Sequence, residues 1–226
     1  MADKEDSEIP PALREQFRQH FRESIRHESG LDHDEFPLFD WFAKETEGLI
    51  ASMRQVEESE VRSQVAAGVE QVNDSGLVAV EYFARRTRYS HVIFLASTFE
   101  SYLTGACSNL ALILREDEMP FTLEDLSGDK WTKRRRFLER YGRFQITDQE
   151  WRAADQLTRV RNLLVHENGA ITALKPKARA ELASLPGIKV DTYEIQVEPQ
   201  FVLETSRALR ELIASIQSRI QQVARR

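Results

Sequence analysis

The chain has few of the residues that cross-link proteins or turn them sharply. Of its 226 residues one is cysteine, Cys107, which excludes a disulfide framework and a cysteine zinc site. Nine glycines and seven prolines are few, and this scarcity favours helices over turn-rich β-sandwiches and barrels. The apolar runs are far too short to cross a bilayer, and the acidic start MADKEDSEIP is unlike a signal peptide. We therefore expect a helical, cytoplasmic protein in which Cys107 is a small buried apolar residue.

The common catalytic motifs are also missing. The sequence has no Walker loop, no GxGxxG, no HExxH, and no strand–helix alternation typical of a parallel sheet. The segment HESGLDHDE contains His27, Asp32, His33, Asp34 and Glu35, but their spacing fits no familiar metal geometry, and a solvated loop is the ordinary interpretation. We expect neither a metal nor another cofactor.

What is present is a normal globular composition with an uneven charge. Apolar residues make up 41% of the chain and charged residues 30%, which suits a protein with a packed core. The net charge is −6, yet residues 1–60 carry 16 acidic and 7 basic side chains, while residues 130–143 carry 7 basic and 1 acidic. The second segment is therefore a local basic patch that the net charge conceals.

Apolar spacing predicts a helical bundle with a small β-hairpin before the C-terminal helix. We divide the chain into a disordered N-terminus (1–10), a helical extension (11–75) and a helical domain (76–226), with a break at Gly76. The hairpin is expected around Asp191-Thr192. The expected helices begin near residue 11 (Leu13, Phe17, Phe21, Ile25) and near residue 38 (Leu49, Ile50, Met53, Val56, Val61), and continue over about 77–115, 131–141, 148–167 and after Pro199 (Val202, Leu209, Ile213, Ile216, Ile220, Val223).

The helix over 148–167 has clear start and stop signals. Thr147 and Glu150 have the spacing of a capping box, in which each side chain binds the other residue's backbone N–H. Leu157, Val160 and Leu164 mark its apolar face, and Gly169 is placed to form a left-handed C-terminal cap.

The end of that helix, RNLLVHENG, combines three polar groups. Asn162 and His166 are four residues apart and share a face, and the long side chain of Arg161 can reach the same region. The last helical turn presents unpaired carbonyls that favour the protonated imidazole, and histidine is suited to proton transfer. Arginine matches phosphate oxygens, so the group suits phosphodiester cleavage without a metal. The alternative is an ordinary solvent-exposed helix end, because such spacings are common by chance.

The stretch RNLLVH resembles the Arg-x(4–6)-His motif of the HEPN superfamily in its Arg-Asn-x-x-x-His form, and ENG resembles the endings that follow it there. Upstream, FLASTFESYL resembles the apolar first core helix of many HEPN proteins. The resemblance covers about residues 85–170 and leaves the first 75 unexplained. It implies an all-α HEPN-like bundle, a metal-independent ribonuclease, and Arg161, Asn162 and His166 as catalytic residues.

The resemblance further implies a homodimer in which two copies of the motif meet in one composite site. It suggests a toxin or an effector of antiviral defence, with an antitoxin or other regulatory protein as a possible partner. The sequence departs from one pattern of the superfamily, in which a tyrosine that a partner protein modifies stands two residues after the histidine. Asn168 occupies that position here, which puts this mode of neutralisation in doubt.

Two further groups are candidates for supporting roles. Glu100 lies in an apolar helix, where a carboxylate needs a partner, and it can position Arg161, pair with another basic group or face solvent. Basic residues interleaved with aromatics, at Lys133, Arg134, Arg135, Arg136 and Arg140, are predicted to bind RNA. For the aromatics, Trp131, Phe137, Tyr141 and Phe144, inward packing is the favoured interpretation, and the arginines can instead pair with the acidic N-terminal region.

Two hypotheses follow for the function. The first is a HEPN-type endoribonuclease, which the intact pair of Arg161 and His166 favours. The second is a catalytically silent HEPN-like module that dimerises and binds RNA or protein.

Overall fold

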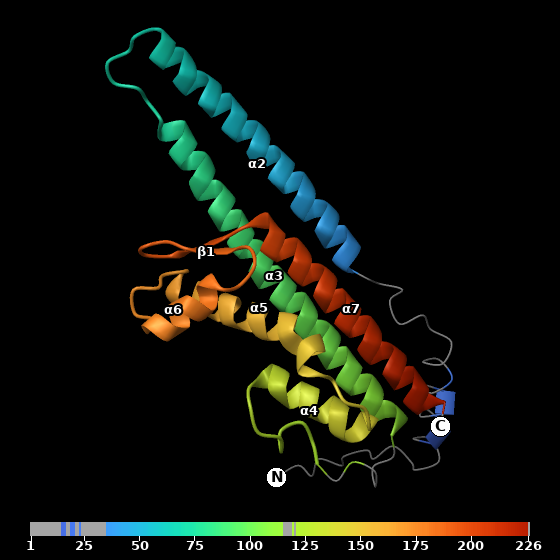
Figure 1. Cartoon of the computed structure of the whole chain (residues 1–226). Helices are drawn as coiled ribbons and strands as arrows, with labels where there is room; N and C mark the ends of the chain where they lie inside the picture. The colour runs from blue at the N-terminus through green and yellow to red at the C-terminus, as the bar shows by residue number, and fades with distance from the viewer. Residues whose placement is uncertain are drawn as a thin grey trace, which may run out of the picture. The chain divides into compact units, whose positions relative to one another are not determined.

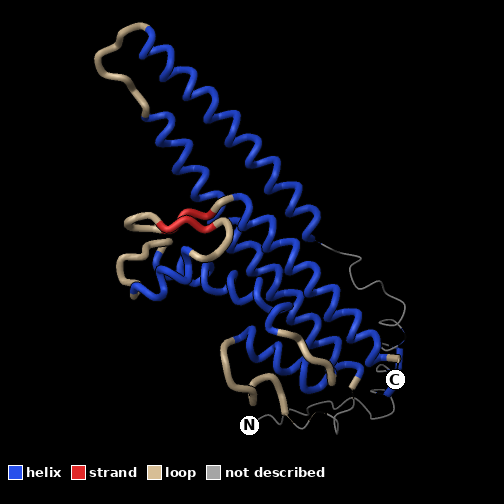
Figure 2. The backbone as a smooth tube through the Cα atoms, viewed as in Figure 1, coloured by secondary structure: helices blue, strands red, loops and turns tan. Residues whose placement is uncertain are grey.

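The computed structural model describes residues 15, 16, 19, 20, 23, 35–114, 119 and 121–225. Within these residues the protein is mostly helical, with six helices and a two-stranded hairpin (Figures 1 and 2). The elements are α2 (Glu35–Ala66), α3 (Ser75–Ile113), α4 (Lys130–Gly142), α5 (Asp148–Glu167), α6 (Pro176–Ala183), β1 (Ile188–Val190), β2 (Ile195–Val197) and α7 (Pro199–Ala224). The predicted helical class and the hairpin before the last helix are confirmed. None of the helices in the described ranges is long and apolar enough to cross a membrane.

The chain divides into two compact units. Among the described residues, one unit comprises those before residue 34, those within 100–147 and those from 212 onward, and the other comprises residues 35–99 and 148–211. Helices α3 and α7 contribute residues to both units. The predicted disordered N-terminus (1–10) and the apolar residues of the predicted first helix lie outside the described residues. The predicted division at residue 76 stays a prediction.

In the second unit, α2 and the first part of α3 form an antiparallel pair (Figure 1). Ile50 packs with Val80 and Ala84 in an apolar cluster between them. The Arg88 guanidinium donates two hydrogen bonds, of 2.8 and 2.7 Å, to the Glu47 carboxylate, and this pairing raises the pKa of Arg88. A charged group removed from water is tolerated when it is paired in this bidentate way.

The predicted apolar stripe of α2 is partly wrong. Ile50 is fully buried, but Leu49, Met53 and Val56 are exposed, with relative exposures of 37–66%. The buried residues of α2 are Phe36, Phe39, Ala43 and Ile50, so Ile50 shares its face with the two phenylalanines and not with the exposed members of the predicted stripe. Helix α2 therefore has two apolar faces, and the pairing with α3 selects one of them.

The break between α2 and α3 comes earlier than predicted. Helix α2 ends at Ala66, and Gly68 follows with a positive φ of 69°. Gly76 lies in the first turn of α3. The polar residues Asn73, Asp74 and Ser75 before it mark the start of that helix and not a break within a helix. The Asn73 side chain accepts a 3.0 Å hydrogen bond from the Ser75 backbone N–H, as expected of a residue at a helix start.

The hairpin and α6 follow the motif helix. β1 and β2 pair antiparallel around the predicted turn at Asp191-Thr192, and the structure sets the register with Lys189 opposite Gln196. Helix α6 was not predicted from the sequence, although Pro176 at its first turn is a recognised start signal. Helix α6 contacts β1, and it is the helix that follows α5 in the chain.

Cys107 is buried in α3, as predicted, and burial raises the pKa of its thiol to about 12. The thiol is therefore neutral and unreactive as a nucleophile near neutral pH.

Candidate functional site

The motif helix α5 places Asn162 and His166 on the side opposite its core face. Leu157 and Val160 are fully buried and Leu164 is nearly so, as the periodicity predicted. Asn162 and His166 are exposed, and Arg161 is half-buried. The amphipathic pattern of α5 thus exposes Asn162 and His166 to solvent, where both side chains can contact a ligand.

The helix ends in two consecutive left-handed residues. Asn168 has a φ of 53° and Gly169 a φ of 84°, and the Gly169 N–H donates to the Leu163 carbonyl at 3.1 Å. The predicted left-handed conformation of Gly169 is confirmed, although the turn begins one residue earlier. Asparagine is among the few residues other than glycine that adopt this conformation readily.

Side chains from α3 hold this helix end. The Tyr89 hydroxyl donates a 2.5 Å hydrogen bond to the Ile195 carbonyl, and burial raises the pKa of Tyr89, so the hydroxyl stays a donor. The Ile195 N–H in turn donates to the Gly169 carbonyl at 2.9 Å. Arg86 donates to the Asn168 side-chain oxygen. The segment just after His166 is therefore tied to α3 through the Asn168 side chain and to β2 through the Gly169 carbonyl.

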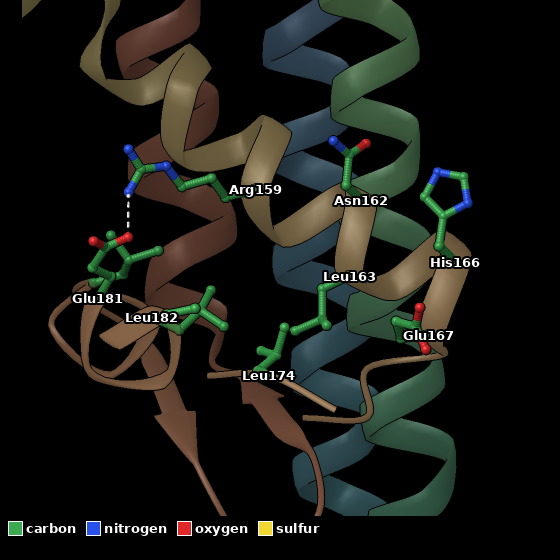
Figure 3. Close-up of a pocket in the computed structure, with 10 residues that line it drawn as sticks. Arg159, Asn162, Leu163, His166, Glu167, Leu174, Glu181 and Leu182 are labelled. Atoms are coloured by element: carbon green, nitrogen blue, oxygen red, sulfur yellow. Dashed lines mark ion pairs between the residues drawn. The ribbon is translucent and has the colours of Figure 1, made fainter. Parts of the chain in front are cut away.

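A pocket of about 560 Å³ opens beside the motif (Figure 3). Asn162 and His166 project from the same side of α5, and both contribute to its lining. The lining also includes Arg159, Leu163 and Glu167 of α5, Leu174 of the following loop, and Ala178, Glu181, Leu182 and Leu185 in and after α6. Its volume falls within the usual range for small-ligand sites, roughly 300–1,000 Å³.

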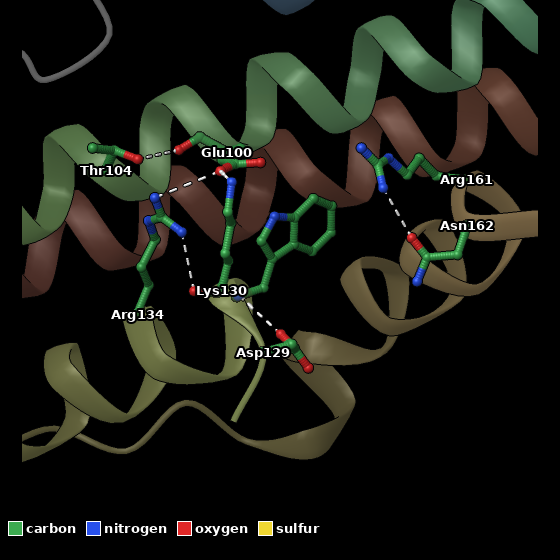
Figure 4. Close-up of polar contacts among 8 residues, drawn as sticks. Glu100, Thr104, Asp129, Lys130, Arg134, Arg161 and Asn162 are labelled. Atoms are coloured by element: carbon green, nitrogen blue, oxygen red, sulfur yellow. Dashed lines mark hydrogen bonds and ion pairs between the residues drawn. The ribbon is translucent and has the colours of Figure 1, made fainter. Parts of the chain in front are cut away.

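Arg161 is connected to this group through Asn162. Its Nη1 donates a 3.0 Å hydrogen bond to Asn162 Oδ1, but Arg161 is not among the residues that line the pocket (Figure 4). Arg161 is therefore hydrogen-bonded to Asn162, and Asn162 lines the pocket together with His166, but Arg161 itself does not line the pocket.

Sequence reasoning missed Arg159, the arginine that does line the pocket. Its guanidinium lies 3.5 Å from the Glu181 carboxylate of α6. Arg159, Asn162 and His166 are separated by steps of three and four, so they share one helical face. That spacing could have identified Arg159, whereas Arg161, five residues before His166, lies to the side.

Glu100 pairs with basic residues of α4. Its carboxylate lies 3.6 Å from both Lys130 Nζ and Arg134 Nη2, and its backbone carbonyl accepts a 2.7 Å hydrogen bond from the Thr104 hydroxyl (Figure 4). Its side chain is 34% exposed, so the carboxylate is partly solvated as well as paired. These contacts do not involve Arg161, and the predicted role of Glu100 in positioning Arg161 stays a prediction.

The predicted RNA-binding residues all lie in α4. Asp129 caps this helix by accepting 2.9 Å hydrogen bonds from the Trp131 and Thr132 backbone N–H groups. These hydrogen bonds lower the pKa of Asp129, and the bond from the Thr132 N–H has the largest effect. Phe137 and Tyr141 are buried, which confirms the favoured interpretation of these two aromatics.

The arginines of α4 make contacts within their own unit. Arg135 pairs with Glu139 at 3.2 Å and donates to the Ile146 carbonyl at 2.5 Å, whereas Arg136 donates to the Ser127 carbonyl at 2.6 Å. The Arg140 guanidinium lies 4.5 Å from the centre of the Phe121 ring. Lys133 Nζ lies 3.5 Å from the Glu124 carbonyl oxygen. Arg136 and Arg140 are the exposed members of the set, so they are the ones best placed to meet RNA.

The predicted solvated loop HESGLDHDE lies outside the described residues except for Glu35, which begins α2. No family model, no curated protein and no solved structure matches the chain.

Proposed function

We propose that the protein is a metal-independent endoribonuclease of the HEPN type, with Arg161, Asn162 and His166 as its catalytic residues. The observation that supports this most is that Asn162 and His166 both line one open pocket while Arg161 is hydrogen-bonded to Asn162. An imidazole can transfer a proton, and a guanidinium and an amide can donate hydrogen bonds to phosphoryl oxygens, which are roles that metal-free cleavage of a phosphodiester uses. In the cell such an enzyme would act as a toxin or as an effector of antiviral defence, held in check by a regulatory protein.

In the proposed reaction the 2′-hydroxyl of the RNA attacks the adjacent phosphorus. The O2′–P bond forms and the P–O5′ bond breaks, which leaves a 2′,3′-cyclic phosphate and a 5′-hydroxyl. His166 takes the proton from the 2′-hydroxyl or gives one to the leaving O5′. Arg161 stabilises the negative charge that develops on the phosphoryl oxygens, and the Asn162 amide donates to one of them.

The chemistry itself supplies the first test. Cleavage should persist in EDTA, since the proposed mechanism uses only side chains of the protein. The products should carry 2′,3′-cyclic phosphates, measured by mass spectrometry, and an RNA with 2′-O-methyl groups throughout should resist because its nucleophile is blocked. Loss of activity in EDTA, or cleavage of the methylated RNA, contradicts the mechanism. If the wild type cleaves no RNA at all, including during phage infection of a host, the silent binding module becomes the better account.

The second test concerns the oligomeric state. The reaction needs one group to remove a proton and another to supply one, and each chain offers one imidazole in this pocket. We propose that the α5 helices of two copies meet near a two-fold axis, so that each copy provides one of these groups. Sedimentation should show a dimer at micromolar concentration. Full activity in a species that sediments only as a monomer would exclude this arrangement.

A further inference from the structure

The pocket beside the motif is larger and more apolar than a phosphate site requires. Leu163, Leu174, Leu182 and Leu185 contribute to its walls, and they come from α5, the following loop, α6 and the residues just after it. A phosphate group is small and prefers N–H donors and cations. Apolar walls of this size instead suit the two faces of a planar nucleobase.

The polar groups of the pocket differ in what they can bind. Glu181 and Glu167 present carboxylates, which accept hydrogen bonds, and Arg159 presents a guanidinium, which donates them. Arg159 and Glu181 lie 3.5 Å apart, and their side chains are 58% and 48% exposed. An ion pair this exposed is weak, so both groups can still form hydrogen bonds to a ligand. Figure 3 shows the two groups facing each other at the end of the pocket away from His166.

We infer that this pocket receives a nucleobase of the RNA next to the cut and prefers bases that carry an exocyclic amino group. The Glu181 carboxylate accepts a hydrogen bond from that amino group, and Arg159 donates to the adjacent ring nitrogen, such as N3 of cytosine. Uracil presents a carbonyl oxygen where cytosine has its 4-amino group, and two acceptors facing each other repel. The inference rests on the proposed function, since it makes the pocket a subsite of the same ribonuclease.

The position of the pocket explains why the base adjoins the cut. Asn162 and His166 belong to the same lining as the leucines and Glu181, so a base in the pocket brings its own sugar and phosphate to these two side chains. Remote binding of this kind orients the reacting 2′-hydroxyl and phosphorus.

The experiment compares cytosine with uracil, which differ at one exocyclic position. RNAs of otherwise identical sequence carry a single C or U on either side of a mapped cut, and kcat/KM is measured for each. The wild type should prefer cytosine by about tenfold, which is the effect of one well-made contact to a base edge. Glu181→Gln replaces the carboxylate with an amide that can donate as well as accept, and should reduce the preference to about twofold or less.

Two further variants separate a subsite from a general effect. Glu58→Gln is the matched control, because Glu58 pairs with Arg62 at 3.4 Å with a similar exposure but lies on α2, outside the pocket lining. It should leave the preference unchanged. Ala178→Phe fills the pocket from α6 and should raise KM for both RNAs and remove the preference.

Binding measurements distinguish failure of this inference from failure of the proposed function. Fluorescence anisotropy with 2′-O-methylated oligo(C) and oligo(U) reports base preference without cleavage. A preference that Glu181→Gln abolishes supports the base site even if no RNA is cut. Equal binding of the two oligomers, or equal cleavage of the two RNAs by the wild type, overturns the base site while leaving the nuclease proposal in place. A preference that survives both Glu181→Gln and Ala178→Phe also overturns it, because the discrimination then arises elsewhere.

Discussion

Replacing His166 with alanine should lower the rate of RNA cleavage by about 10²–10⁴-fold, because a positioned proton-transfer group typically contributes that much. The side chain of His166 is exposed on α5, so its removal should cost little packing and leave the helical circular dichroism and the melting temperature nearly unchanged. Single-turnover rates on a defined RNA measure the effect. Expression of the wild type should slow growth of the host, and expression of His166→Ala should not.

Three further variants make this result specific. His20→Ala removes another exposed histidine and should leave the rate unchanged. Arg161→Ala should lower the rate strongly, through loss of charge stabilisation at the phosphoryl group. Arg159→Ala should act mainly on KM and on base preference, because Arg159 lies with Glu181 in the proposed base site. If Arg159→Ala lowers kcat more than Arg161→Ala does, the two arginines have exchanged the roles assigned here.

Replacing Gly169 with alanine should destabilise the protein by about 2–3 kcal/mol, the sum of a left-handed residue with a Cβ and one disturbed hydrogen bond. Gly169 has a φ of 84°, and a Cβ built there lies 2.6 Å from the Tyr89 hydroxyl oxygen. The tyrosine must then move away from the Ile195 carbonyl that it binds. Chemical denaturation gives the free energy of unfolding, and the cleavage rate should also fall, because the displaced segment follows His166.

Gly48→Ala is the matched control for that change. Gly48 lies inside α2, and a Cβ there meets nothing within 4 Å. Alanine should therefore stabilise the helix by roughly 0.5–1 kcal/mol. If Gly169→Ala is as stable as the wild type, the contact between Tyr89 and the helix end is not as close as the structure has it.

The sequence was informative where a helix has one apolar face. The spacing of Leu157, Val160 and Leu164 identified the core side of α5 and, with it, the exposed side that carries His166. For α2 the same reasoning failed, because Phe36 and Phe39 define a second apolar face beside that of Leu49 and Val56. Local spacing cannot decide between two such faces, since the choice depends on which residues of α3 they meet.

The pocket could not be predicted from the sequence for a related reason. One of its sides comes from α6, a helix of eight residues whose buried side chain is Leu182, too few for a periodic signal. Its position beside α5 follows from contacts with β1 and cannot be obtained from local sequence. Arg159 was detectable from its seven-residue spacing to His166, but the Arg-Asn-x-x-x-His pattern directed attention to Arg161.

The hydrogen bond from Tyr89 to the Ile195 carbonyl joins residues 106 positions apart in the chain. Contacts of such long range are slow to form, because the ends of the intervening chain must first be brought together. During synthesis the ribosome releases Tyr89 and the whole motif well before Ile195, so the motif helix spends that interval without the strand that fixes its end. The nuclease we propose would thus acquire its ordered site only after the β2 segment has been synthesised, so its activity would depend on a strand that comes later in the chain than the motif itself.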